Sequence, residues 1–255
     1  MSAEFSNLSL EPPFVRQERG TRSLHFTVGE IQSSMRLDRP DELQLDYTRT
    51  MMGFLLLNRQ PRHIAMIGLG GGSLVKFCHG CLPTARMTVV ENNPKVIALR
   101  GEFEVPDDDD RLSVLEDDGA AFVRRLRGDI DVLLVDGFDH TGQPAQLCSQ
   151  SFYDHCFGAL AAGGVMVANL HIDHPEHDLF TARISRSFKG NAMQVLATEK
   201  ANCIVFAGRR LPVTLHALRS PAWAGELEPR ARRQLRGEFA HIGWNACPLG
   251  GPRST

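Results

Sequence analysis

The chain has 255 residues, a formal net charge of -2 at pH 7 and 42% hydrophobic residues, which is the composition of an ordinary globular protein large enough to bury a substantial core. This charge excludes the broad basic surface by which proteins bind nucleic acid non-specifically, so we expect no nucleic-acid partner. No apolar run approaches the ~20 residues of a membrane helix, and no charged-then-apolar leader precedes the six scattered cysteines, which favours a cytoplasmic protein with no membrane partner.

The first part of the chain is predicted to form a tail followed by a small hairpin. Residues 1–23 lack periodicity and are expected to be a flexible tail. Residues 24–34 alternate apolar and polar side chains around Gly29, a pattern typical of a β-hairpin. Apolar residues at helical spacing then predict a lead-in helix over residues 43–57, which Pro61 ends. The hairpin and this helix make up an expected N-terminal region over residues 24–58.

Strands and helices alternate over the next stretch, residues 59–210. Apolar segments predict strands at residues 63–67, 87–90, 112–115, 130–135 and 164–168. Two further strands, near residues 193–197 and 203–207, are joined by a polar turn. This order predicts an α/β fold with a doubly wound, mostly parallel, seven-stranded sheet of the Rossmann-like, class I methyltransferase type, with ligands at its C-terminal edge. Residues 211–255 are expected to form a helical extension.

A glycine-rich turn follows the first strand of this sheet. It contains Gly68, Gly70, Gly71 and Gly72. Such a turn bends sharply and leaves the N–H groups of the following helix open to a ligand. Its spacing is not G-x-G-x-x-G, which argues against a dinucleotide pyrophosphate. Glu91 ends the second strand about 20 residues later, where a carboxylate can accept both ribose hydroxyls; the alternative is a solvated carboxylate at a strand end.

Aspartates follow the third and fourth strands at the same edge of the sheet. Asp118, which precedes Gly119, can hold the exocyclic amine of adenine, cap the next helix, or do both. Asp136 and Asp139 follow the fourth strand, where a carboxylate can hold a cationic amine or take a proton from one. For this pair the alternative is a turn in which the aspartate bonds to its own backbone. With the glycine turn, these carboxylates predict a site for a sulfonium nucleoside of the S-adenosylmethionine type.

Residues 24–170 resemble the spermidine synthase (polyamine aminopropyltransferase) family. The similar motifs, in chain order, are Glu30-Ile-Gln-Ser-Ser34, Val89-Val-Glu91, Asp117-Asp-Gly119, Asp136-Gly-Phe-Asp139, Ser151-Phe-Tyr153 and Gly163-Gly164. The resemblance implies that the thioadenosine of S-adenosylmethionine, or of its decarboxylated form, is held as co-substrate by Gln32, Glu91, Asp118 and Gly119. It also implies that Asp136 is the base that frees an attacking amine. Further implications are a small-molecule acceptor contacted by Tyr47, Asp139 and Tyr153, a homodimer, and no metal.

The chain departs from the family pattern on the acceptor side. The family's glycine loop carries an aspartate near the aminopropyl tail, where this chain has Gly71. Its Y-H-E motif falls on Asp46-Tyr-Thr48, and His140 stands where it has proline. We therefore expect S-adenosylmethionine to bind at least as tightly as its decarboxylated form. A methyltransferase on the same fold and a non-catalytic nucleoside-binding protein are the alternatives to an alkyl (aminopropyl) transferase.

Two further constellations are interpreted without a metal. Cys78 and Cys81 have redox spacing but lie within a predicted helix and lack a second pair for zinc, so we expect two core thiols. His171, His174 and His177 follow the fifth strand at the rim of the site and are interpreted as solvated residues or substrate contacts.

Overall fold

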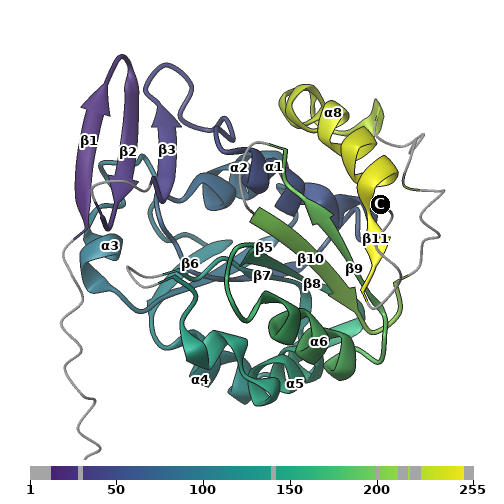
Figure 1. Ribbon diagram of the computed structural model, residues 1–255. Coiled ribbons are helices and arrows are strands. Elements are labelled where there is room, and N and C mark those ends of the chain that lie inside the picture. Colours follow the sequence, from purple (N-terminus) through teal and green to yellow (C-terminus); the bar gives the residue numbers. More distant parts are fainter. Residues whose placement is uncertain are drawn as a thin grey trace, which may run out of the picture.

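A central sheet organises this computed structural model, which describes residues 13–27, 31–138, 142–198, 202–211, 218 and 225–249. The strands, in spatial order, are β11 (Cys247–Pro248), β9 (Ala192–Leu196), β10 (Asn202–Gly208), β8 (Leu160–His171), β7 (Ile130–Val135), β4 (His63–Ile67), β5 (Arg86–Glu91) and β6 (Leu112–Glu116). The five from β8 to β6 run parallel, whereas β10 is antiparallel to both β8 and β9. The predicted doubly wound fold is confirmed (Figure 1), and the two-residue β11 adds an eighth strand to the expected seven.

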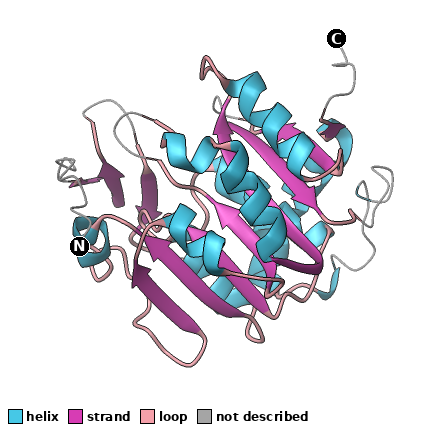
Figure 2. Cartoon of the chain, turned by 90° about the horizontal axis from the view of Figure 1, so that it is seen from below, coloured by secondary structure: helices cyan, strands magenta, loops and turns pink. Residues whose placement is uncertain are grey.

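Successive residues of each central strand enter opposite cores, which is why these strands are apolar throughout. On β4, Ile64 and Met66 pack into one buried cluster, and Ala65 and Ile67 pack into the other. Helices therefore cover both faces of the sheet (Figures 1 and 2). The first face carries α1 (Asp46–Met51), α2 (Ser73–Cys81), α3 (Pro94–Ala98) and α8 (Pro229–Asn245), and the second carries α4 (Gly119–Arg125), α5 (Gln150–Ala159) and α6 (His177–Ser187).

The expected tail is wrong in its second half, because β1 (Phe14–Glu18) pairs with β2 (Thr21–His25). Arg19 and Gly20 join these strands with φ angles of 49° and 78°, the left-handed pair that a two-residue hairpin turn requires. The expected hairpin is present as β2 paired with β3 (Ser33–Arg36), so the region is a three-stranded antiparallel sheet. Residues 1–12 lie outside the described part of the chain.

Two expected boundaries also shift. The lead-in helix begins at Asp46 and continues as a 3₁₀ turn, η1 (Met52–Leu56). Arg49 donates to the carbonyls of Leu43 and Gln44, which holds the preceding chain outside the helix. The fifth parallel strand is longer than expected because α5 ends at Ala159 and β8 begins at once. Before α5, a short 3₁₀ turn, η2 (Ala145–Cys148), borders the edge of the sheet that carries the site.

Candidate active site

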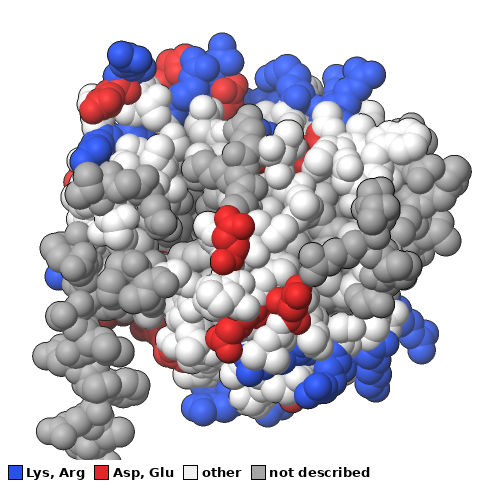
Figure 3. Space-filling view, viewed as in Figure 1, with Lys and Arg blue, Asp and Glu red and all other residues white. Residues whose placement is uncertain are grey.

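A pocket opens at the C-terminal ends of the parallel strands, where the sequence placed the site. Nine of the predicted residues line it, namely Gln32, Tyr47, Gly68, Gly70, Gly71, Glu91, Asp118, Gly119 and Asp136. They come from the residue before β3, from α1, from the end of β5, from the turns after β4, β6 and β7, and from the start of α4. On the face shown in Figure 3, Lys and Arg gather at the upper and lower margins, while the middle is mostly uncharged with a few acidic groups.

The turn after β4 requires glycine at two positions. Gly68 has a φ of +91°, and a Cβ there would lie 2.3 Å from the carbonyl oxygen of Asp136. Gly72 has a φ of +65°, and its Cβ would lie 2.2 Å from Cγ2 of Val105. Both positions combine a left-handed backbone with no room for a side chain. Gly72 caps α2 and is not among the residues that line the pocket, so its contribution is to shape the turn.

Glu91 is tied to the glycine turn. Its Oε2 accepts the backbone N–H of Leu69 at 2.9 Å, and its Oε1 accepts that of Asn93 at 2.9 Å. Burial raises the pKa of the Glu91 carboxyl, and the backbone N–H groups oppose that rise. The carboxylate is therefore not the solvated strand-end group of the alternative interpretation. The backbone N–H groups of Asn92 and Gly70 also act on this carboxylate, and the side chain borders the pocket.

Asp118 caps a helix and also faces the pocket. Its Oδ1 accepts the backbone N–H of Ala121 at 2.6 Å at the start of α4. The other carboxylate oxygen has no such role in the cap, so capping and adenine binding are compatible. Gly119 allows the start of α4 to pack closely against Ile67 of β4, because a Cβ at position 119 would lie 2.5 Å from Cγ2 of Ile67.

Asp136 stands at the end of β7 with a donor on each carboxylate oxygen. Asn169 Nδ2 donates to Oδ1 at 2.9 Å, and the Tyr47 hydroxyl donates to Oδ2 at 3.3 Å. Burial raises the pKa of the Asp136 carboxyl to about 6, although both hydrogen bonds lower it. A carboxyl with such a pKa is ionised at neutral pH and can still take a proton, as a general base requires.

Asn169 is a site residue that the sequence interpretation missed. It lies near the end of β8, is 2% exposed, and also accepts from Asn202 Nδ2 through its Oδ1 at 2.9 Å. The available signal was a lone amide inside an otherwise apolar strand that ends beside Asp136. A buried polar side chain in such a position needs a partner.

Two predicted acceptor contacts are not part of the described pocket. Tyr153 is 1% exposed and lies in the core beneath α5, with its ring 5.4 Å from that of Phe152. It is a buried residue of α5 and does not line the described pocket, so the structure corrects it to a core residue. Asp139 lies outside the described residues.

The small N-terminal sheet contacts the glycine turn and the start of α2. Ser33 on β3 lies 3.4 Å from Ser73 at the start of α2, oxygen to oxygen. A Cβ at Gly71 would lie 2.6 Å from the Ser33 Oγ and 2.8 Å from Cδ1 of Phe103. An aspartate at position 71 therefore has no space unless these side chains move.

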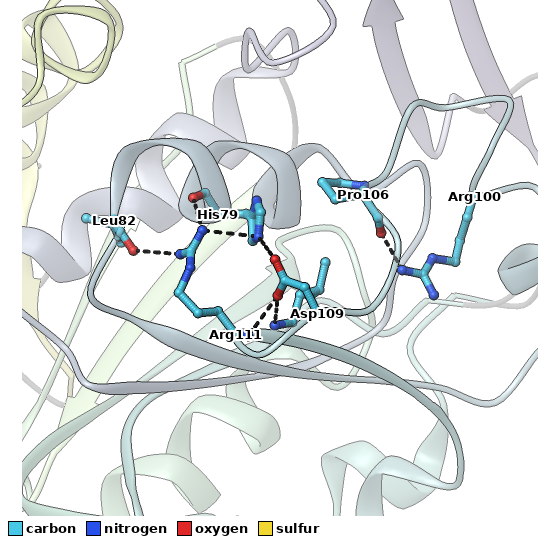
Figure 4. Close-up of polar contacts among 7 residues, drawn as sticks. His79, Leu82, Arg100, Pro106, Asp109 and Arg111 are labelled. Carbon is cyan, nitrogen blue, oxygen red and sulfur yellow. Dashed lines mark hydrogen bonds and ion pairs between the residues drawn. The ribbon is translucent and has the colours of Figure 1, made fainter.

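A polar cluster braces the segment from Arg100 to Arg111 (Figure 4), which carries Phe103 and Val105. Asp109 accepts from His79 at 2.9 Å and from the backbone N–H of Arg111 at 2.7 Å. These contacts lower the pKa of the Asp109 carboxyl to about 2. The segment before β6 is thus anchored to α2.

Of the cysteine pair, Cys78 is the expected core thiol, whereas Cys81 is only partly buried. Cys78 is fully buried against Met52, and burial raises the pKa of its thiol. Burial, followed by the neighbouring Glu228, raises the pKa of Cys81 to about 12. Within the described ranges, His, Cys, Asp and Glu form no group of three or more that could hold a metal ion. None of the described helices combines the length and apolarity needed to span a membrane.

Comparisons with known protein sequences find similarity to enzymes of polyamine synthesis. A sequence model described as the spermine/spermidine synthase domain matches residues 44–205. The polyamine aminopropyltransferase of Chromobacterium violaceum is 40% identical over 230 residues, covering 89% of this chain and 87% of that protein.

Two solved structures share the fold. A probable spermidine synthase from Corynebacterium glutamicum gives a TM-score of 0.69 at 20% identity and covers 88% of this chain and 84% of its own. Human methyltransferase-like protein 13, solved in complex with SAH, gives 0.62 at 22% identity and covers 82% and 96% respectively. At these identities the two structures bear on the fold alone.

Proposed function

Because the chain belongs to the spermine/spermidine synthase domain family, we propose that it is a transferase that moves an aminopropyl group from a sulfonium nucleoside to an amine acceptor. The observation that carries this proposal is Asp136, a carboxyl with a pKa of about 6 that Tyr47 and Asn169 hold at the pocket. A binding module for the nucleoside alone has no need of a base in this position.

In the proposed reaction the amine nitrogen attacks the carbon next to the sulfonium sulfur. A carbon–nitrogen bond forms, the carbon–sulfur bond breaks, and its electron pair leaves with the sulfur as a neutral thioether. Asp136 accepts the proton that the attacking amine loses. Glu91 and Asp118 accept hydrogen bonds from the ribose and adenine, and the turn after β4 places the sulfonium against the acceptor.

The homodimer and the cytoplasmic location expected from the sequence remain predictions.

The identity of the co-substrate depends on Gly71. An acidic side chain near the tail would repel the carboxylate of S-adenosylmethionine, and at position 71 this chain has none. The lost repulsion in a partly buried site amounts to on the order of 1–3 kcal/mol, or roughly ten- to a hundredfold in relative affinity. We propose that S-adenosylmethionine binds at least as tightly as its decarboxylated form, which also favours the methyltransferase as the second candidate function.

Titration calorimetry with both nucleosides tests the co-substrate proposal. The Cβ at position 71 would contact both Ser33 and Phe103, so Gly71→Asp is made together with Ser33→Gly and Phe103→Ala, with Ser33→Gly and Phe103→Ala without Gly71→Asp as the control. The triple variant should shift preference toward the decarboxylated form. A tenfold or greater preference for that form in the unchanged protein contradicts the argument.

Transfer itself is tested with Asp136→Asn. Mass spectrometry of the products from each nucleoside with putrescine distinguishes methyl transfer from transfer of the propyl chain, which is aminopropyl from the decarboxylated form and aminocarboxypropyl from S-adenosylmethionine. We expect turnover to fall at least about 100-fold in the variant, with methylthioadenosine affinity unchanged. The control is Asp131→Asn, at the opposite end of the same strand, where the carboxylate accepts the backbone N–H groups of Arg62 and His63. Equal turnover by Asp136→Asn and unchanged protein would contradict the role of Asp136.

A further inference from the structure

A line of buried amides runs from the antiparallel edge of the sheet to Asp136. Asn202 Nδ2 donates to Asn169 Oδ1 at 2.9 Å, and Asn169 Nδ2 donates to Asp136 Oδ1 at 2.9 Å. Asn169 is 2% exposed and Asn202 is 6% exposed. Neither is among the residues that line the pocket, so these two side chains are placed to act on Asp136 and not on a ligand.

Sheet register produces this line. Val135 of β7 is paired with Ala168 of β8, so the next residues, Asp136 and Asn169, are neighbours on the same face. On the other side of β8, Asn202 is opposite His171. Asn169 is two residues before His171, and diagonal neighbours two residues apart project from the same face of a sheet.

The orientation of the Asn169 amide decides what Asp136 experiences. With its NH₂ group toward Asp136 it donates a hydrogen bond to the ionised carboxylate, whereas the flipped amide would present an oxygen and repel it. Asn202 Nδ2 donates to the oxygen of Asn169, and this NH₂ group cannot pair with a second NH₂ group, so the contact favours the first orientation. We propose that Asn202 and Asn169 are positioning residues for the base, with Asn202 acting only through Asn169.

The pKa of Asp136 depends on the charged and titratable groups around its carboxyl. The groups that contact it are Tyr47 from α1 and Asn169 from β8. The other titratable groups of the described surroundings are Asp46 beside Tyr47, Glu91 after β5, Asp117 and Asp118 after β6, and His171 at the end of β8. A hydrogen bond to an ionised group is lost when Asn169 is replaced, and this disfavours the ionised form.

The experiment uses three variants of the full chain: Asn169→Leu, Asn202→Leu and the double variant. The readout is the acid limb of the pH profile of kcat/KM, which reports the base in the free enzyme. We expect a limb near pH 6 in the unchanged protein, in line with the Asp136 pKa of about 6. Asn169→Leu should raise the limb by about one pH unit. Asn202→Leu should raise it by less, and the double variant should match Asn169→Leu.

Non-additivity separates positioning from general damage, because a residue that acts through another has no effect once that other is gone. A limb that Asn202→Leu leaves in place, or one that moves further in the double variant than in Asn169→Leu, overturns the proposal. Should leucine at either position prevent folding, Asn169→Ala and Asn202→Ala give the same comparison.

The kinetic readout rests on the proposed function, so a second readout is independent of turnover. Carbon-13 NMR titration of labelled aspartate carboxyls follows Asp136 directly in the same variants, and Asp136→Asn assigns its signal. The same order of shifts is expected. If the unchanged protein transfers no group but the NMR shifts follow this order, the proposed function fails and the amide line stands; absent shifts in an active enzyme mean the reverse.

Discussion

Replacing Gly72 by alanine should destabilise the fold by an amount that can be separated into two parts. The first is the left-handed backbone, with a φ of +65°, which costs an alanine about 1–2 kcal/mol. The second is the overlap of the new Cβ with Val105, whose Cγ2 would lie 2.2 Å away. Forcing a methyl group into a packed core costs about 1–3 kcal/mol, so we expect Gly72→Ala to lower the free energy of unfolding by about 2–5 kcal/mol.

A matched glycine isolates the backbone part. Gly128 has a φ of +69°, and a Cβ there would meet nothing within 4 Å, so Gly128→Ala should cost only about 1–2 kcal/mol. Val105→Ala should then recover part of the loss in the Gly72→Ala background, because it removes the methyl group that the new Cβ meets.

The variants are Gly72→Ala, Gly128→Ala, Val105→Ala and the double variant that combines the first and the third. Urea denaturation measures their free energies of unfolding, and calorimetry with methylthioadenosine shows whether the distorted turn also weakens binding. The reasoning is refuted if Gly72→Ala costs no more than Gly128→Ala, or if Val105→Ala adds its full cost in the Gly72→Ala background.

Two other substitutions test the supports of the site. Glu91→Gln should weaken methylthioadenosine binding at least tenfold, or about 1.4 kcal/mol, because the ribose loses a charged acceptor; calorimetry that finds equal affinity would limit Glu91 to bracing the turn. Asp109→Asn should change the acid unfolding curve, because the folded pKa of Asp109, about 2, is below its ordinary value of 3.8. The ionised group stabilises the fold above pH 3.8, and this contribution is lost as the pH falls toward 2. The variant should therefore lose less stability over that range in circular dichroism melts, and an identical pH dependence would contradict the role of Asp109.

Local patterns predict the strands of the sheet well. The bounds of β4 and β7 follow their apolar runs, because a strand buried on both faces reads as continuous hydrophobic sequence. β1 is different, since Phe14–Glu18 is mostly exposed and shows no alternation. Its pairing depends on the turn at Arg19 and Gly20, where a left-handed arginine gives little sequence signal.

The residues of the candidate site also divide into those that local sequence patterns predict and those that they do not. Residues at the ends of strands, such as Glu91, or directly after them, such as Asp136, were predictable, because parallel strands bring their C-terminal ends to one edge. Tyr153 was misplaced because a motif position does not decide which face of a helix is buried. The Asn169–Asn202 pair depends on the register between β8 and β10, and two strands 30 or more residues apart fix that register only in the folded state.

The pocket is assembled from two stretches of chain that are far apart in sequence. Ser33 and Tyr47 precede the first strand of the sheet, whereas Glu91, Asp118 and Asp136 all follow it. Tyr47 and Asp136 are 89 residues apart in sequence and meet only where these two stretches close on each other. The N-terminal stretch is therefore part of the catalytic unit and not an appendage to it. Tyr47 and Met51 also pack in the same buried cluster as Ile64 and Met66 of β4, so a substitution that reshapes this side of the pocket also acts on the packing of the sheet.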